Sequence, residues 1–182
     1  MIGRHRKQRL IDYERTYQEE DIEKDLERQR VCCFCKRENN PILWAHCADG
    51  FKGICIAFQI VPQSGSAEHA FTCRPGVTFY PVQCDGIAKL YKSASYPVST
   101  TRRILLQKTQ EWSVEDEYRI ISEERYIPFG NQIRMTKILL GPRIEPRIRP
   151  VWRTVFKSLT DSLEVEIAET TINNVGRVEI VE

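Results

Sequence analysis

The sequence predicts an α+β fold, in which a mixed, mostly antiparallel sheet is packed with helices in a single domain. Two observations support this class. Short β-prone segments alternate irregularly with helical segments, whereas a parallel α/β sheet needs a regular strand–helix repeat. The chain has 182 residues, the length of one domain, and it shows no internal repeat or low-complexity stretch.

Residues 1–30 carry dense charge of both signs around a narrow apolar stripe. The stripe has helical spacing and consists of Leu10, Tyr13, Tyr17, Ile22 and Leu26. Acidic residues at 19–21 face Lys24 and Arg28 at helical spacing, as on a solvated helix surface. The sequence therefore predicts a charged N-terminal helical segment over residues 1–30, followed by one α+β domain over residues 31–182.

Three strands and a short helix are predicted in the first half of this domain. Residues 31–34 form a buried strand, and a helical turn over residues 42–48 precedes a strand over residues 53–60. Because both faces of segment 53–60 are apolar, we expect it to be a central strand. Residues 77–82 are also β-prone, and Pro81 favours an edge position or a strand end.

Helices and strands continue to alternate in the second half. A helix is predicted over residues 99–112, and strands are predicted over residues 118–122 and 133–140. Pro150 begins the clearest helix, with an apolar stripe of 3.6-residue period formed by Val151, Trp152, Val155, Phe156, Leu159 and Leu163. Two half-buried strands, joined by a turn at residues 173–174, end the sequence.

Charge is nearly balanced, because 27 Lys plus Arg against 25 Asp plus Glu give a net charge of +2. This balance gives no indication of a nucleic-acid coat protein or a polybasic membrane binder. No apolar run approaches the roughly 20 residues of a membrane span. The basic start also lacks the apolar segment of a secretory signal. We therefore expect a cytoplasmic protein that does not bind membranes.

Seven cysteines are an odd number for a disulfide framework, in a chain long enough to form its own core. The simpler interpretation is a reducing compartment in which most thiols are small buried hydrophobic groups. Five cysteines and His46 cluster between residues 32 and 55, but they form an irregular ligand set for a structural zinc site. Residues 31, 33 and 35 alternate like one face of a strand, so we expect no metal.

Polar and aromatic side chains are concentrated in two segments, of which residues 43–58 are the first. Trp44 and His46 lie directly before a predicted buried strand, where ionisable groups can open into a cleft. His46 is the only histidine near a predicted core element. The alternative is that Trp44 packs in the core and that His46 bonds a backbone carbonyl, since structural histidines are common.

The second segment is residues 108–121, in which Glu115 and Glu117 form an E-x-E pair before a strand. On an extended chain two such residues share a face, about 7 Å apart. Carboxylates that close raise one another's pKa and can stabilise an oxocarbenium-like centre, as in cleavage of an N-glycosidic bond. Acidic pairs of this kind are more often part of a solvated surface.

The neighbours of this pair leave both interpretations open. Trp112 and Tyr118 flank it, and aromatic rings can stack on a flat ligand ring. Arg119 continues the same face and could instead neutralise the pair in a structural salt bridge. The phosphate-loop, nucleophile-elbow, zinc-protease and dinucleotide-binding motifs are all absent from the sequence.

Four blocks occur in a characteristic order: Cys33-Phe34-Cys35, then LWAHCADGFKGICIAF at 43–58, then Lys108 with EWSVEDEYRI at 111–120, then KILLGPRI at 137–144. This order resembles the bacterial family called domain of unknown function 2971 over most of residues 31–180. That family usually has Tyr where Cys47 stands, and its N-terminal Asn-Asp-Pro-Phe-like motif has no counterpart in residues 1–30. We therefore expect a short or N-terminally truncated member.

The E-x-E motif before a strand is also similar to the catalytic motif of ADP-ribosyltransferases. This resemblance implies that Glu117 is the catalytic carboxylate and that Glu115 is its companion on the acceptor side. It further implies that His46 holds the ribose of NAD. The residues expected to bind NAD are then Trp44, Trp112, Tyr118 and Arg119, of which Trp112 or Tyr118 would stack on nicotinamide.

Two functions follow as hypotheses. The first is an enzyme similar to an ADP-ribosyltransferase or an NAD glycohydrolase, with a protein or nucleic acid as acceptor. It predicts that His46, Trp112 and Glu117 converge on one cleft. The second is a non-catalytic interaction or defence-associated module, which predicts that Trp44, His46 and Trp112 are buried and that Glu117 pairs with Arg119 or Lys108. The oligomeric state is open.

Overall fold

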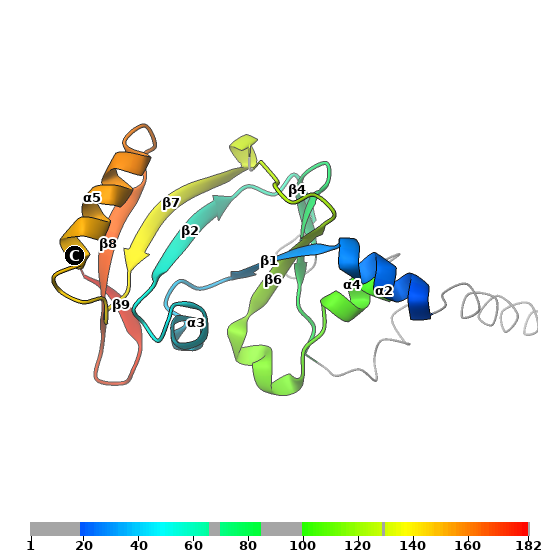
Figure 1. Cartoon of the computed structure of the whole chain (residues 1–182), viewed down its shortest axis with the longest axis horizontal. Coiled ribbons are helices and arrows are strands. Elements are labelled where there is room, and N and C mark those ends of the chain that lie inside the picture. The colour runs from blue at the N-terminus through cyan, green and yellow to red at the C-terminus, as the bar shows by residue number, and fades with distance from the viewer. Residues whose placement is uncertain (1–18, 66–69, 85–99, 129, 182) are drawn as a thin grey trace, which may run out of the picture.

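The computed structural model describes residues 19–65, 70–84, 100–128 and 130–181. Helices and two mostly antiparallel sheets make up these residues, which confirms the predicted α+β class (Figure 1). The strands divide into two sheets rather than one, because the strand that follows β1 along the chain pairs with a different partner.

The first sheet has five antiparallel strands in the order β1-β6-β5-β4-β3. The strands are β1 (Arg30–Cys35), β6 (Glu117–Ser122), β5 (Val77–Pro81), β4 (Phe71–Arg74) and β3 (Ser64–Gly65). One face carries Phe71, Cys73, Val77, Phe79 and Ile120, which form a core together with Ile133 of the second sheet. Pro81 is the last residue of β5, as expected for a residue without a backbone N–H.

The second sheet has four strands in the order β2-β7-β8-β9, and only the β7–β8 pair is parallel. The strands are β2 (Ile54–Ile60), β7 (Ile133–Leu140), β8 (Glu166–Ile172) and β9 (Val178–Val181). Trp44, Ala48, Leu139, Ala168 and Val178 form its core. The prediction of a central strand over residues 53–60 is wrong, since β2 is an edge strand whose side chains line a cavity.

The N-terminal helix is present as α2 (Glu19–Arg28), and it contacts α4 (Thr100–Leu105) (Figure 1). The predicted stripe residues Leu10, Tyr13 and Tyr17 lie outside the described residues.

The single helix expected over residues 99–112 is wrong, because α4 ends at Leu105 and a 3₁₀ helix, η2 (Gln110–Glu115), follows it. Backbone bonds between Gln83 and the chain at residues 106–108 hold the intervening segment extended.

The helix α3 (Pro41–Cys47) confirms the helical turn predicted before β2. Asn40 is its N-cap, and the side-chain oxygen accepts a bond from the backbone N–H of Ile42. The Asn40 side-chain nitrogen donates to the carbonyl of Val114 in η2 over 2.8 Å. One side chain thus caps α3 and joins it to η2, which places these two elements side by side.

The helix predicted from Pro150 is α5 (Arg149–Thr160), and the short 3₁₀ helix η3 (Gly130–Gln132) precedes β7. The apolar stripe of α5 is exposed except for the half-buried Phe156, although such a stripe is typical of a face that packs on a core. The predicted C-terminal strands are β8 and β9, and their turn is closed by the Gly176 N–H bond to the Asn173 carbonyl.

Gly141 marks a close approach between the end of β7 and the loop at residues 51–53. Its N–H donates to the Gly53 carbonyl over 3.0 Å, and a Cβ would overlap the carbonyl oxygens of Phe51 and Gly53. We expect Gly141→Ala to lower the free energy of unfolding by about 2 kcal/mol, measured by urea denaturation.

Gly176→Ala is the matched control for this substitution, because Gly176 has a positive φ of 77° but open space around a Cβ. We expect it to lower the free energy of unfolding by only about 1 kcal/mol, from backbone strain. Equal losses for the two variants would contradict the steric argument.

Candidate functional site

A group of charged side chains lies where η2 ends and β6 begins. Asp116, in the left-handed region with φ of 51°, separates Glu115 at the end of η2 from Glu117 at the start of β6. The pair is therefore not the extended E-x-E that the sequence suggested. The two carboxylates nevertheless meet at Lys108, whose Nζ contacts Glu115 Oε2 and lies 2.6 Å from Glu117 Oε2.

Arg119 holds the Glu117 carboxylate from the other side. Its Nε donates to Glu117 Oε1 over 2.7 Å and its Nη2 donates to Oε2 over 3.2 Å, a two-point contact that fixes the orientation of the carboxylate. The remaining Nη1 donates to the carbonyl of Leu105. The Glu117 side chain is only 8% exposed and that of Lys108 is 24% exposed, so Lys108 covers the carboxylate.

Glu117 is ionised at neutral pH. Burial acts to raise its pKa, but hydrogen bonds from Arg119, Cys33 and Lys108 outweigh burial and lower the pKa to about 2. The expectation that the paired glutamates raise each other's pKa is therefore wrong for Glu117. The lysine between the two carboxylates and the arginine beside them supply the compensating positive charge.

Two exposed aromatic rings extend this group of charges. The Lys108 Nζ lies 5.4 Å from the centre of the Trp112 ring, a cation–π contact. The ring of His46 meets Trp112 edge-on, with 5.7 Å between ring centres. His46 is exposed and Trp112 is 40% exposed. We call the connected set the Glu117 cluster, which comprises His46, Lys108, Trp112, Glu115, Glu117 and Arg119.

Two of the residues expected to bind NAD lie outside the Glu117 cluster. Trp44 is 2% exposed in the core of the second sheet, and its Nε1 donates to the Glu38 carbonyl over 2.7 Å. Tyr118 points to the opposite face of β6 from Glu117, where its ring lies 5.8 Å from that of Phe71. Successive strand residues alternate between faces, so Tyr118 could not share a face with Glu117.

Lys108 and Cys33 belong to the site but were not among the expected site residues. Lys108 stands in one of the four sequence blocks, which was the available signal. Cys33 lies opposite Arg119 in the β1–β6 ladder, and its thiol hydrogen-bonds to Glu117. Cys33 stands in another of these blocks, but only the strand pairing brings it beside Glu117.

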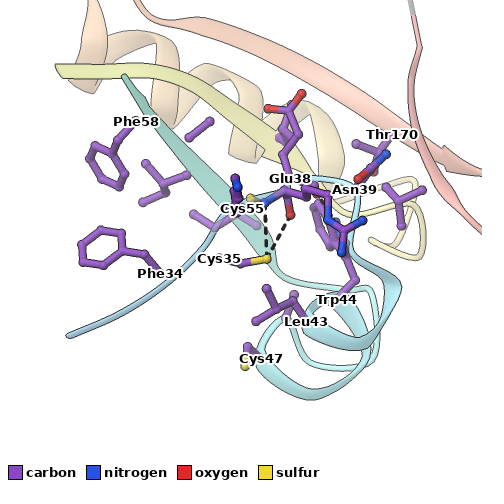
Figure 2. Close-up of a pocket in the computed structure, with 18 of the residues that line it drawn as sticks. Phe34, Cys35, Glu38, Asn39, Leu43, Trp44, Cys47, Cys55, Phe58 and Thr170 are labelled. Carbon is purple, nitrogen blue, oxygen red and sulfur yellow. Dashed lines mark hydrogen bonds between the residues drawn. The ribbon is translucent and has the colours of Figure 1, made fainter. Parts of the chain in front are cut away.

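A cavity of about 990 Å³ separates β1 from β2, which are edge strands of the two sheets. Figure 2 shows Phe34 and Phe58 at one end of this cavity, with Leu43 and Trp44 from α3 at the other end. Cys33 lines the cavity and also bonds to Glu117. The cavity therefore adjoins the Glu117 cluster through one thiol.

All seven cysteines are free, and five of them line this cavity: Cys32, Cys33, Cys35, Cys47 and Cys55. Only Cys73 is buried, so the prediction that most thiols are buried core groups is wrong. The reason is that β1 is an edge strand facing the cavity. Burial raises the pKa of Cys55 to about 11, and burial together with Glu117 raises that of Cys33 to about 11, so both are protonated thiols.

Within residues 19–65, 70–84, 100–128 and 130–181, no group of three or more His, Cys, Asp or Glu side chains is placed to hold a metal ion. No helix in this part of the chain is both long enough and apolar enough to cross a membrane.

Comparison with known proteins gives no match to a family profile, to a curated protein sequence or to a solved structure. The resemblances to domain of unknown function 2971 and to ADP-ribosyltransferases therefore stay predictions from the sequence.

Proposed function

We propose that the chain is an enzyme that breaks the N-glycosidic bond between nicotinamide and ribose in NAD, with Glu117 as the catalytic carboxylate. The observation that carries this proposal is an ionised carboxylate, oriented by Arg119, beside two exposed aromatic rings. Breaking this bond develops positive charge on the ribose ring. A fixed negative charge that is already in place stabilises such a centre without reorganisation.

The other members of the Glu117 cluster have matching roles in this proposal. Trp112 offers a ring face for the nicotinamide, and His46 beside it donates to a ribose hydroxyl. Arg119 acts as a positioning residue, because its two-point contact sets the angle of the carboxylate. Glu115 would accept the proton of the attacking water or acceptor hydroxyl.

Lys108 controls access to the carboxylate in this scheme. Its ammonium group covers Glu117, so the substrate reaches the carboxylate only when Lys108 moves aside. The diphosphate of NAD is the part of the substrate that attracts an ammonium group. We therefore infer that substrate binding draws Lys108 from the carboxylates to the diphosphate.

A second candidate function has a specific observation in its favour. Both oxygens of Glu117 already accept bonds from Arg119 or Lys108, an arrangement that also serves stability alone. In this alternative the chain is a non-catalytic interaction or defence-associated module in which the Glu117 cluster joins η2 to β6.

Incubation of the purified protein with NAD labelled in the nicotinamide ring tests the proposal. We expect the wild type to release nicotinamide, and Glu117→Gln to reduce the rate at least about 100-fold, since it removes the charge and keeps the shape. Glu166→Gln is the control, because that side chain is 56% exposed and pairs only with Lys137 in the described residues. We expect it to retain the full rate.

Two further measurements test for transfer to an acceptor and for correct folding of the variants. Each reaction is repeated with a protein extract and with nucleic acid, so that transfer is detected as well as hydrolysis. Circular dichroism spectra of both variants establish that each is folded. If the wild type releases no nicotinamide under any of these conditions, the enzyme proposal is wrong and the non-catalytic module is favoured.

A further inference from the structure

The helix α5 lies beside β8 (Figure 1), and most of its apolar stripe is exposed. Exposed fractions are 59% for Val151, 68% for Leu159 and 54% for Leu163, and they lie between 41% and 44% for Ile148, Trp152 and Val155. The opposite side of the helix is polar, and there Arg149 donates to Glu169 of β8 over 2.9 Å. Arg149, Phe156 and Thr160 are the only α5 residues that are half-buried or buried, so most of the apolar stripe is exposed to solvent.

Single exposed apolar residues are ordinary, but this stripe is continuous along the whole helix. Apolar patches of several hundred Å² on a protein surface mark interaction sites. The twelve residues of α5 extend over about 18 Å. A surface of this shape fits another helix better than it fits a small molecule.

We propose that a second copy of this chain covers the stripe, with the two α5 helices antiparallel across a two-fold axis. The charges at the helix ends support this partner. Arg147 lies exposed just before α5, and Asp161 lies exposed just after it. Among the described residues neither forms an ion pair. Antiparallel pairing brings Arg147 of each copy beside Asp161 of the other.

The apolar stripe and these charges require nearly the same axis. Arg147 and Asp161 are equally far along the chain from residue 154, and Val155 is at the centre of the stripe. In a two-fold interface each residue pairs with its mirror position in the other copy. With the axis at Val155, that residue meets the partner's Val155, Val151 meets the partner's Leu159, and Arg147 lies two residues from the position opposite the partner's Asp161.

The charges around α5 argue against a lipid surface as the occupant. Helices that lie on anionic membranes carry Lys and Arg along the border of their apolar face. Arg149 and Arg153 of α5 contact Glu169, and Arg147 and Lys157 add positive charge. Asp161 and Glu164, however, flank Leu163 at one end of the stripe, and the Glu164 side chain is 88% exposed. An anionic membrane would repel this end, whereas a second copy offers it Arg147.

Sedimentation equilibrium between about 1 and 300 μM tests the proposal, because an interface of one helix pair predicts micromolar affinity. We expect a reversible dimer of the wild type. Val155→Asp places two like charges at the axis and should weaken the dimer at least about 100-fold. Val175→Asp is the control, since Val175 is 76% exposed in the β8–β9 turn. These exposed sites let both variants fold, which circular dichroism checks.

A charge exchange tests the antiparallel arrangement. We expect Arg147→Asp and Asp161→Arg each to weaken the dimer about 10-fold, and the double variant to restore it. A wild type that stays monomeric over the whole range overturns the proposal, as does a Val155→Asp variant that dimerises like the wild type. A monomer that cosediments with phosphatidylserine vesicles through Val155 would assign the stripe to a membrane instead.

Discussion

Replacing Trp44 with alanine is expected to lower the free energy of unfolding by about 4 kcal/mol. The indole ring is 2% exposed and packs in the core that contains Leu139 and Val178. Its Nε1 donates to the Glu38 carbonyl over 2.7 Å. The truncation would leave a large cavity and an unpaired carbonyl, and both act against folding. Urea denaturation followed by circular dichroism measures the change.

Trp112→Ala is the matched control for Trp44→Ala. Trp112 is 40% exposed, so we expect its removal to change the free energy of unfolding by less than about 1 kcal/mol. Trp44→Phe keeps most of the ring volume and should cost about 2 kcal/mol, mainly for the lost hydrogen bond. Equal costs for Trp44→Ala and Trp112→Ala would contradict the assignment of Trp44 to the core and Trp112 to the surface.

This pair of tryptophans also separates structure from function. Under the proposed function, Trp112→Ala weakens NAD binding in a protein that keeps its stability. Trp44→Ala instead impairs activity only as far as it unfolds the chain. The resemblance to ADP-ribosyltransferases implied that both residues bind NAD, and the sequence gave no measure of their burial.

Element types follow from local signals, and the sequence predicted these well. The strand over residues 133–140 and the helix that begins near Pro150 match β7 and α5, because each has a strong period and a proline or glycine at its boundary. Sheet position depends on pairing between distant segments. Because both faces of β2 are apolar, the sequence predicted a central strand. In the structure β2 is an edge strand, and its apolar side chains line a cavity.

The Glu117 cluster was predictable only in part. The proximity of His46 to Trp112 depends on Asn40, which joins α3 to η2 by a bond between residues 74 positions apart in the sequence. No local sequence pattern indicates a hydrogen bond between residues so far apart. The placement of Tyr118 away from Glu117 could have been derived, since neighbouring strand residues face opposite sides.

Glu117→Gln is expected to lower the free energy of unfolding by about 3 kcal/mol at pH 7, because Arg119 loses its anionic partner at a site where both side chains are mostly buried. The cost should depend on pH. The pKa of Glu117 is about 2 in the folded protein, whereas the ordinary pKa of a glutamate side chain is 4.5. As the pH falls below 4.5 the unfolded chain binds this proton first, so the stabilisation is complete above that pH and is lost toward pH 2.

The difference in unfolding free energy between wild type and Glu117→Gln should therefore narrow by about 1 to 2 kcal/mol from pH 6 to pH 3. Water at the edge of the cluster screens the charges, so this change is smaller than the shifted pKa of Glu117 alone would give. Urea denaturation at both pH values measures it. In Lys108→Met, which removes one hydrogen bond to the carboxylate, the pKa of Glu117 in the folded protein rises, so the narrowing should be smaller and should end at a higher pH. A difference that stays constant between pH 6 and pH 3 would show that Glu117 binds its proton equally well in both states, and the fixed anion required for catalysis would then lack support.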